Sequence, residues 1–318
     1  MRAVQLADIL TAPTVVDIEP PVLRPGTLRV SIRACGLNFA DLLMQKGIYQ
    51  DTPKPPFTMG MEISGIVTEV SVEIAEFQVG DRVMIFCGRD GLAEEGVFDA
   101  ACAIKIPDSM TFEDAAAFPI SYGTAHLALG RRANLQRGEK LLVTGAAGGA
   151  GRTAVELGKL MGAQVIAHAR GAKKLEVAKA AGADYIIDDS WDIRAELKAL
   201  GGVDVVYDTV GGTAFEAAFS ACKPEGRLLT IGFASGDVPQ ILANHLLVKN
   251  LTVIGLYLTP YLSLRPEVFG NSLTTLIRWY ENGQLKPHIS HVLPLEQTLD
   301  GFELLRSRQA TGKVVIVP

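Results

Sequence analysis

The sequence predicts an α/β protein in which a doubly wound parallel sheet is combined with a second, β-rich domain. Three observations predict this class. An apolar strand at 140–144 runs into a glycine-dense turn that a helix follows. Strands and helices alternate between about 118 and 258, which is typical of a sheet covered by helices on both faces. Before about residue 107, short β-rich runs are separated by turns that contain Pro and Gly.

The elements follow from hydrophobic periodicity. The N-terminal region is expected to form a compact β barrel, with strands that include 28–34, 63–70 and 82–86. The alternating region is expected to contain six strands, at 140–144, 164–169, 185–188, 203–208, 227–232 and 252–258. Helices are expected between them, at 152–161, 173–181, 191–200 and 213–221. The tail adds a helix at 272–282 and a closing strand at 313–317. A chain of 318 residues is long for a single core, so two domains are expected.

The glycine-dense turn has the pattern Ala146-x-Gly148-x-x-Gly151, a G-x-G-x-x-G fingerprint with alanine first. The middle glycine lets the backbone approach a pyrophosphate, and the last lets the helix lie close to the strand. The amides that open the helix hold the anion. The alternative is an ordinary tight strand-to-helix turn. The predicted pyrophosphate contacts are Ala146, Gly148, Gly149, Ala150 and Gly151.

The second strand of this unit indicates which nucleotide binds. An NAD site places an Asp or Glu at its end, about 20 residues past the glycines, to accept from the ribose 2′-OH. This chain has Arg170 there, and Lys174 follows one turn later. A guanidinium binds phosphate oxygens bidentately and a lysine adds a point charge, so the 2′-phosphate of NADP(H) is favoured. The alternative is a solvated basic helix start.

Composition excludes several classes of function. A formal net charge of −5 leaves no global basic surface, which argues against nucleic acid or an anionic membrane as a partner. No apolar run is long enough to span a bilayer, and Asp8 interrupts the N-terminus too early for a signal peptide. The four cysteines are scattered, without metal-ligand spacing, and are expected to be reduced. We therefore expect a cytoplasmic protein.

Four further motifs carry a resemblance to a known family: Gly36-Leu37-Asn38-Phe39-Ala40-Asp41, Gly60-Met61-Glu62-x-x-Gly65, Val79-Gly80-Asp81-Arg82-Val83 and Tyr122-Gly123-Thr124-Ala125. With the glycine turn, they make the chain resemble, over essentially its whole length, the zinc-independent quinone oxidoreductases of the medium-chain dehydrogenase/reductase superfamily, a family that includes zeta-crystallin. The resemblance implies a GroES-like domain from 1–117 and 259–318. It also implies a Rossmann NADP(H)-binding domain at 118–258.

The resemblance also bears on metals. Zinc-dependent relatives have Cys, His and Cys where this chain has Asn38, Met61 and Ala116. These three side chains cannot supply the thiolate and imidazole ligands of a catalytic zinc. No metal is therefore expected. Without a Lewis acid to stabilise an alkoxide, the expected substrates accept hydride readily, as quinones and α,β-unsaturated carbonyls do.

The resemblance implies roles for individual residues. Asn38 and Tyr49 correspond to residues near the nicotinamide and the substrate, and the catalytic residue Asp41 is expected to orient its neighbours. The alternatives are a turn residue that caps the next helix for Asn38, a cap for Asp41 and a core aromatic for Tyr49. Glu62, which has lost its zinc context, is expected in a buried ion pair. The further expected coenzyme contacts are Asn38, Thr124, Val210, Gly232, Phe233 and Ser235.

Two departures from the family pattern stand out. A second active-site tyrosine of some relatives is replaced by Leu43, which puts a quinone pocket copied from them in doubt. A tyrosine beside the 2′-phosphate is replaced by Asp189, next to Asp188. An acid near a phosphate is unfavourable unless it points away or pairs with Arg170 or Lys174.

The leading hypothesis is an NADPH-dependent oxidoreductase that reduces a quinone or an α,β-unsaturated carbonyl. An enoyl thioester reductase is the alternative within that class. A nucleotide-binding protein without turnover, with a structural or redox-sensing role, is the alternative from another class. A homodimer is also expected, because the apolar strand at 252–258 would lie at the sheet edge, where an unpaired strand needs a cover. The alternative is that the tail covers this strand within one chain.

Overall fold

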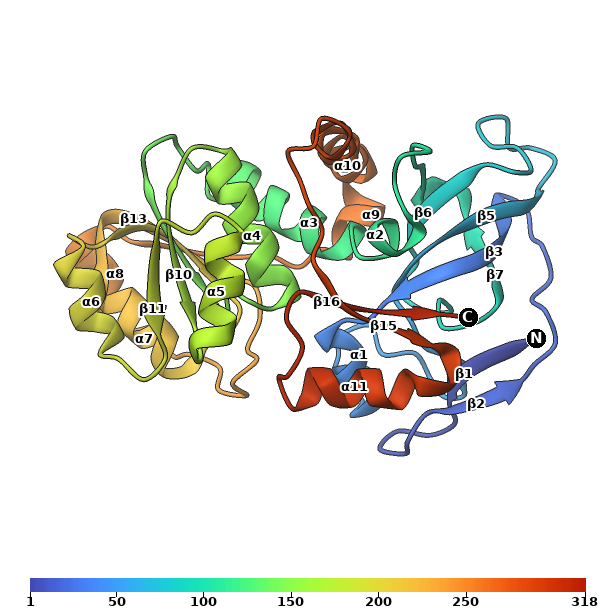
Figure 1. Cartoon of the computed structure of the whole chain (residues 1–318), viewed down its shortest axis with the longest axis horizontal. Coiled ribbons are helices and arrows are strands. Elements are labelled where there is room, and N and C mark those ends of the chain that lie inside the picture. Colours follow the sequence, from blue (N-terminus) through green and yellow to red (C-terminus); the bar gives the residue numbers. More distant parts are fainter. The chain divides into compact units, whose positions relative to one another are not determined.

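The computed structural model describes residues 1–318 and divides the chain into two units (Figure 1). Unit 1 consists of Met1–Ile120 and Tyr261–Pro318, and unit 2 of Ser121–Pro260. The limits lie two or three residues beyond those that the sequence suggests. At the first limit, Phe118 still packs edge-to-face on Tyr280, which belongs to the C-terminal part of unit 1.

Unit 2 is built on a six-stranded parallel sheet in the order β11-β10-β9-β12-β13-β14. This is the expected doubly wound order. The strands are β9 (Lys140–Thr144), β10 (Gln164–Ala169), β11 (Tyr185–Asp188), β12 (Val203–Asp208), β13 (Cys222–Thr230) and β14 (Thr252–Gly255). The Rossmann prediction is confirmed, and the first four strands have the predicted bounds.

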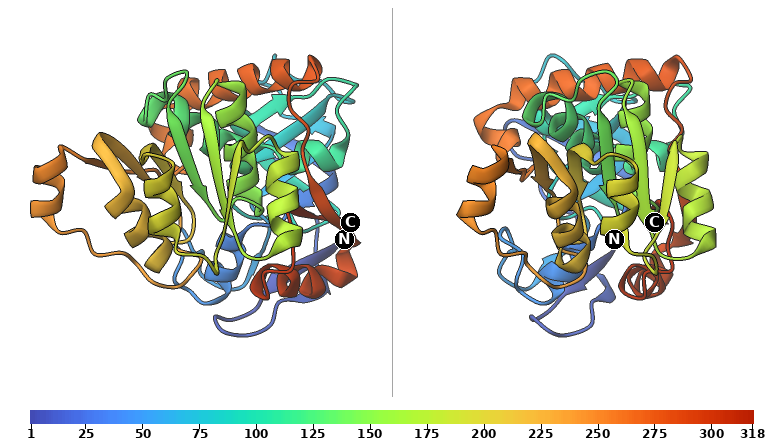
Figure 2. Two further views of the ribbon diagram at one scale, coloured as in Figure 1. Left: turned by 60° about the vertical axis from the view of Figure 1, so that its left-hand side comes forward. Right: turned by 90° about the vertical axis from the view of Figure 1, so that its left-hand side faces the viewer.

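Helices cover both faces of this sheet. The segments of unit 2 are α3 (Pro119–His126), the π-helical turn η2 (Leu127–Arg132), α4 (Gly149–Leu160), α5 (Ala172–Ala180), α6 (Ile193–Ala199), α7 (Gly212–Ala221) and α8 (Ala243–Lys249). Leu142 of β9 packs with Leu197 of α6 and Phe215 of α7, whereas its neighbour Leu141 approaches Gly158 of α4. Successive residues of β9 thus face opposite helix layers, which explains the continuous apolar strands. Figure 2 shows helices on both sides of this sheet.

Unit 1 contains a large sheet in the order β15-β16-β3-β5-β6-β8, with β7 also paired to β3, and a small sheet β2-β1-β4. The strands are β1 (Arg2–Leu6), β2 (Thr14–Asp17), β3 (Thr27–Gly36), β4 (Phe57–Thr58), β5 (Glu62–Val70), β6 (Arg82–Phe86), β7 (Glu95–Asp99), β8 (Ala103–Lys105), β15 (Ile289–Pro294) and β16 (Lys313–Val317). The helical segments are α1 (Phe39–Gln45), η1 (Ala100–Cys102), α2 (Phe112–Ala116), α9 (Pro260–Leu264), α10 (Pro266–Glu281), η3 (Leu295–Gln297) and α11 (Thr298–Arg306).

The register of three strands in unit 1 positions the candidate catalytic residues. At the end of β3, Gly36 pairs with Glu62 at the start of β5 and with Val315 of β16. The closing strand of the chain therefore lies against the residues that precede α1. Lys313, the first residue of β16, comes within reach of Asn38 although 275 positions separate them.

Several predicted elements have different bounds. The strand predicted at 227–232 lies at Cys222–Thr230. The helix predicted from 152 begins at Gly149, because Gly149 and Gly151 already adopt helical geometry. The helix predicted at 272–282 begins at Pro266, where the proline occupies the first helical turn and needs no N–H partner. The strand predicted at 252–258 ends at Gly255, and Leu256 and Leu258 are buried within the chain.

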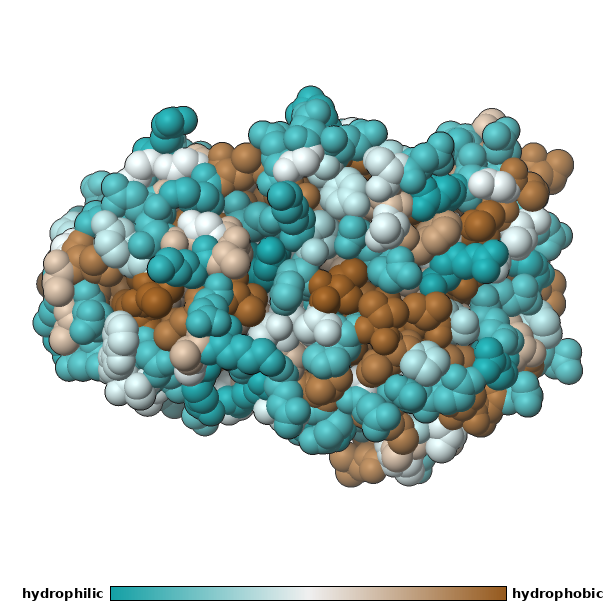
Figure 3. Space-filling model, in the orientation of Figure 1, coloured by the Kyte–Doolittle hydropathy of each residue, from teal (hydrophilic) through white to brown (hydrophobic).

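No helix has both the length and the apolar character needed to cross a bilayer. On the face drawn in Figure 3, hydrophobic side chains form separate patches among hydrophilic ones.

Candidate active site

In unit 2 the glycine turn connects β9 to α4, and its geometry depends on two glycines. A Cβ on Gly151 would lie 2.2 Å from the Gly145 carbonyl oxygen, so only glycine allows the helix to start this close to the turn. A Cβ on Gly148, the N-cap of α4, would meet nothing nearer than 3.5 Å. The helix does not require a glycine there, and the open space leaves room for a ligand. The first amides of α4 have no acceptor within the helix and suit an anion.

A buried carboxylate fixes the neighbouring loop at the carboxyl edge of the sheet. Asp208, the last residue of β12, accepts from the Thr144 hydroxyl of β9 and from the Gly211 amide at 2.9 Å. The Thr209 hydroxyl in turn donates to the Thr144 carbonyl at 2.8 Å. Burial raises the pKa of Asp208. These bonds hold the ends of β9 and β12 together at the point where the strand order reverses, where sheets of this kind bind ligands.

The predicted contacts after β12 and β13 meet at this same edge. The Ser235 hydroxyl donates to the Val210 carbonyl at 2.6 Å, and the Ser235 amide donates to the same oxygen at 2.9 Å. Phe233, two residues earlier, is 38% exposed. Gly232 donates to the Asp208 carbonyl and so ties this loop to the previous one. Thr124 lies separately in α3 and is buried.

Arg170 and Asp189 form an ion pair after β10 and β11. The Arg170 Nε donates to Asp189 Oδ2 at 2.9 Å, and the Arg170 side chain remains 69% exposed. Asp189 Oδ1 lies 3.2 Å from Nε2 of the buried His168, whose pKa burial lowers. The acid that replaces the family tyrosine is therefore engaged by the arginine.

Asp188 and Lys174 lie beside this pair. Asp188 accepts from the amides of Gly171 and Ser190 and from the Ser190 hydroxyl, and these bonds lower its pKa. Lys174 lies in the first turn of α5 and is partly exposed. Asp188 is hydrogen-bonded within its own loop, and Asp189 is paired with Arg170. Arg170 and Lys174 therefore remain suited to an anionic group despite the two carboxylates.

In unit 1, Asn38 belongs to a buried polar cluster with Glu62 and Lys313. Asn38 Nδ2 donates to Glu62 Oε1 at 2.9 Å, and Lys313 Nζ donates to Asn38 Oδ1 at 2.9 Å. Lys313 also forms an ion pair with Glu62 Oε1 at 2.6 Å. The Glu62 side chain is fully buried and that of Lys313 is 6% exposed, while Asn38 is partly exposed. The buried ion pair expected for Glu62 is thus present.

Asp41 lies one turn into α1 and fixes the start of that helix. Its Oδ2 accepts from the Asn38 amide at 2.8 Å, and together with the Asn38 side chain it forms a capping box at the start of α1. Its Oδ1 is buried without a hydrogen-bond partner. Burial raises the pKa of Asp41 to about 7, while the Asn38 amide and the Lys313 charge act in the opposite direction.

Tyr49 lies in the turn that follows α1. Its carbonyl accepts from the Thr52 amide at 3.1 Å and from the Thr52 hydroxyl at 2.7 Å, and its side chain is partly exposed. Leu43, which stands where some relatives have a tyrosine, lies in α1 and is also partly exposed. Tyr49 is thus not a fully buried core aromatic.

Asn38, Met61 and Ala116 stand at the three positions that hold zinc ligands in zinc-dependent relatives. Met61 and Ala116 are buried, and the side chain of Asn38 is committed to Glu62 and Lys313. No group of three or more His, Cys, Asp or Glu side chains is placed to hold a metal.

The sequence did not point to three residues that shape these sites. Lys313 is the one cation in the closing strand Lys-Val-Val-Ile-Val, and a charge at the start of an otherwise apolar strand is the signal that could have drawn attention to it. Asp208 ends a buried strand, which is a comparable signal. Gly145 has a φ of +63°, and a Cβ there would meet Thr209 Oγ1 at 2.5 Å.

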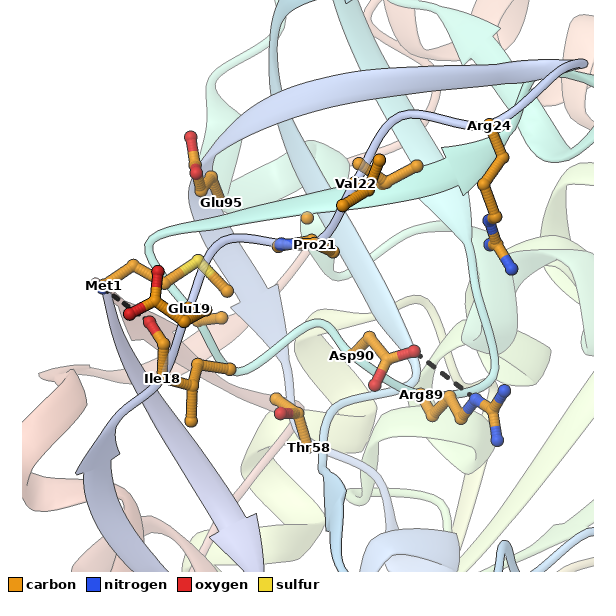
Figure 4. Close-up of a pocket in the computed structure, with 13 residues that line it drawn as sticks. Met1, Ile18, Glu19, Pro21, Val22, Arg24, Thr58, Arg89, Asp90 and Glu95 are labelled. Atoms are coloured by element: carbon orange, nitrogen blue, oxygen red, sulfur yellow. Dashed lines mark hydrogen bonds and ion pairs between the residues drawn. The ribbon is translucent and has the colours of Figure 1, made fainter.

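A surface cavity of about 380 Å³ lies elsewhere in unit 1 and contains none of the predicted site residues (Figure 4). Three of its charged groups already have partners. Arg89 pairs with Asp90 at 3.3 Å, and the N-terminal amine donates to the Ile18 carbonyl at 2.9 Å. We assign no chemistry to this cavity.

Comparisons with known proteins match both units. Residues 24–108 match the family model of the alcohol dehydrogenase GroES-like domain, and residues 149–274 match that of the zinc-binding dehydrogenases. Quinone oxidoreductase-like protein 2 of Bos taurus is 38% identical over 320 residues, which cover 99% of this chain and 92% of that protein.

Solved structures agree with these matches. The quinone oxidoreductase of Thermus thermophilus, determined also in complex with NADPH, is 34% identical, with a TM-score of 0.89 over 100% of both chains. The Escherichia coli quinone oxidoreductase in complex with NADPH is 26% identical, with a TM-score of 0.93 over 100% of both chains.

The two folds and the glycine turn define a medium-chain dehydrogenase/reductase. Within that superfamily the chain belongs to the quinone oxidoreductase family, as the sequence motifs indicated. An oxidoreductase of this superfamily is the class of enzyme that follows.

Proposed function

We propose that this protein is an NADPH-dependent reductase that transfers hydride, without zinc, to a quinone or an α,β-unsaturated carbonyl. The observation that carries the proposal is the glycine turn of unit 2 followed by Arg170 and Lys174 where an NAD site has an acid. The NADPH complexes of the Thermus and Escherichia coli relatives support the same coenzyme.

The residues of unit 2 fit NADPH. The open space at Gly148 and the first amides of α4 suit the pyrophosphate. The exposed guanidinium of Arg170, already oriented by Asp189, suits the 2′-phosphate together with Lys174. We further propose that Val210, Phe233, Ser235 and Thr124 contact the rest of the coenzyme.

Bound NADPH supplies the hydride, so the protein contributes binding, orientation and exclusion of water. In our proposal Asn38 and Tyr49 of unit 1 contact the nicotinamide half of the coenzyme or the acceptor, and the buried Asp41 orients Asn38 through its hydrogen bond to the Asn38 amide. Asn38, Met61 and Ala116 offer no Lewis acid site, and we therefore infer that the acceptor must be electrophilic without metal activation.

The experiment that tests this function is a panel of acceptors. Purified protein is mixed with NADPH and, separately, with quinones, enals, enones and an enoyl thioester, and the loss of nicotinamide absorbance is followed. Reduction of a quinone, enal or enone is the expected result. Reduction of the thioester alone would favour the enoyl reductase. Tight NADPH binding without oxidation by any acceptor would favour a non-catalytic, redox-sensing protein.

We also propose a homodimer formed through β14. This strand ends the six-stranded sheet, and Val253 and Ile254 are partly exposed along it. Pairing with the same strand of a second copy would complete its unpaired backbone groups and join two sheets. The contact is shorter than the sequence suggests, because Leu256 and Leu258 are buried within the chain.

A further inference from the structure

The carboxylate of Asp189 is held in place from three sides. The Asp189 amide donates to the Ala169 carbonyl at 3.0 Å, which joins the loop after β11 to the end of β10. Its Oδ2 accepts from Arg170 Nε at 2.9 Å, and its Oδ1 lies 3.2 Å from Nε2 of His168. Because the backbone and both carboxylate oxygens are engaged, the side chain has little freedom to turn away from these neighbours.

His168 supports this carboxylate from the interior of unit 2. The imidazole is 3% exposed, Asp189 Oδ1 faces its Nε2, and neither ring nitrogen has another hydrogen-bond partner. A nitrogen without hydrogen would repel a carboxylate oxygen, so the hydrogen of the neutral ring belongs on Nε2. If Asp189 moved away, this buried N–H would lose its acceptor, which is unfavourable.

Arg170 keeps one end of its guanidinium group for a ligand. Its Nε donates to Asp189, no group of the protein accepts from Nη1 or Nη2, and the side chain is 69% exposed. The Nε side of the planar group is thus occupied, and the end that carries Nη1 and Nη2 remains open. Two N–H groups in this arrangement match two oxygens of one phosphate group.

Asp189 has two opposing effects on a phosphate bound at this end of Arg170. Its negative charge repels the phosphate, but the two anions would lie on different sides of the guanidinium, and the screening length is about 8 Å at physiological salt. Ordering a long, exposed side chain on binding lowers affinity about 2- to 10-fold, and Asp189 has already ordered Arg170. The favourable effect is therefore the larger one.

We propose that Asp189 is a specificity-determining residue that increases the preference for NADPH over NADH, and that His168 is a positioning residue that acts through it. The carboxylate holds the guanidinium of Arg170 in the orientation that receives the 2′-phosphate. NADH lacks this phosphate and gains nothing from the arrangement. The acid that stands here in place of the family tyrosine thus favours the phosphorylated coenzyme, contrary to what its charge alone suggests. The inference rests on the proposed use of NADPH and concerns unit 2 alone.

The first test is a double-mutant cycle between Asp189 and Arg170. The affinities for NADPH and NADH are measured by nicotinamide fluorescence at about 0.15 M salt. Asp189→Ala should raise the dissociation constant of NADPH about 2- to 10-fold and leave that of NADH unchanged. In the Arg170→Ala background the same change should cause no further loss of NADPH affinity. Tighter NADPH binding by Asp189→Ala would mean that the carboxylate repels the phosphate, and it would overturn the proposal.

Two further outcomes would also overturn it. An equal loss of affinity for NADPH and NADH would mean that Asp189 only supports the fold, and an equal loss in both backgrounds would mean that it does not act through Arg170. Glu176→Ala is the matched control, because it removes an exposed carboxylate of α5 that forms no ion pair, and it should not weaken NADPH binding. Absence of NADPH binding by the wild-type protein would instead overturn the proposed function.

The second test addresses His168. His168→Gln keeps an N–H group near the position of Nε2, whereas His168→Leu removes it. The leucine variant should weaken NADPH binding about twofold or more and leave NADH binding unchanged, and the glutamine variant should stay close to the wild type. In the Asp189→Ala background, His168→Leu should have no further effect on NADPH affinity. A wild-type ratio of NADPH to NADH affinity in His168→Leu would overturn the positioning role. Thermal midpoints and NADH binding identify a variant that does not fold, and the cycle between Asp189 and Arg170 then decides the proposal.

Discussion

The Gly148→Ala variant should lose NADPH affinity while its free energy of unfolding changes little. The added methyl group would meet nothing closer than the Gly145 carbonyl oxygen at 3.5 Å, and the φ of −79° suits alanine. Alanine is a poorer N-cap than glycine, so the free energy of unfolding should fall by about 1 kcal/mol or less. The methyl group would occupy the space proposed for the pyrophosphate, so NADPH affinity should fall at least about tenfold, or about 1.4 kcal/mol.

Two other glycines provide matched comparisons. A Cβ on Gly151 would lie 2.2 Å from the Gly145 carbonyl oxygen and 2.7 Å from its carbon, so Gly151→Ala must move backbone and should cost about 1–3 kcal/mol of stability or more. Gly130 has only the flexible end of Met161 within 4 Å, so Gly130→Ala should change neither property. Urea denaturation and fluorescence titration measure the two quantities. NADPH binding by Gly148→Ala at wild-type strength would refute the reasoning about the turn.

Three other predictions follow from the structure. Replacing Arg170 and Lys174 by alanine should weaken NADPH binding several-fold to a hundredfold, while NADH binding stays nearly constant. The reason is that charge-assisted hydrogen bonds to phosphate contribute about 1.5–3 kcal/mol when fully formed. Equal losses of affinity for both coenzymes would contradict this role of the two cations. Burial raises the pKa of Asp41 from 3.8 to about 7, so the folded chain keeps a proton that the unfolded chain releases, and stability should fall as pH rises from about 4 to 7, by up to about 4 kcal/mol. Urea midpoints at pH 5 and pH 8 should therefore differ less for Asp41→Asn than for the wild type, and equal differences would contradict the burial argument. Light scattering should give a mass of twice the 34.0 kDa of one chain, and the Ile254→Pro variant should have the mass of a single chain. A wild-type protein with the mass of a single chain would contradict the dimer.

Local sequence signals identified most of unit 2. Its strands are short apolar runs between glycine turns, and four of the six have the predicted bounds. The edge strand β14 was overestimated because Leu256 and Leu258 continue its apolar character, although they pack into the chain. Where such a strand ends depends on which of its residues are buried by distant parts of the chain, and the local sequence pattern does not show this.

Unit 1 was harder to predict in detail. The family motif located Asn38 and Asp41, and the loss of zinc ligands predicted an ion pair for Glu62. The identity of its partner, Lys313, depends on the pairing of β16 with β3, a contact between the two ends of the chain. The orientation of the Asn38 side-chain amide also depends on Lys313, so it follows only from the three-dimensional structure.

The central claim is that this chain reduces an electrophilic acceptor with NADPH and without zinc. The most direct measurement determines kcat/KM for the best acceptor of the panel and the zinc content on one sample, before and after treatment with a chelator. We predict much less than one zinc per chain and an NADPH-dependent rate that the chelator leaves unchanged. One zinc per chain, with a rate that is lost and restored together with the metal, would contradict the account.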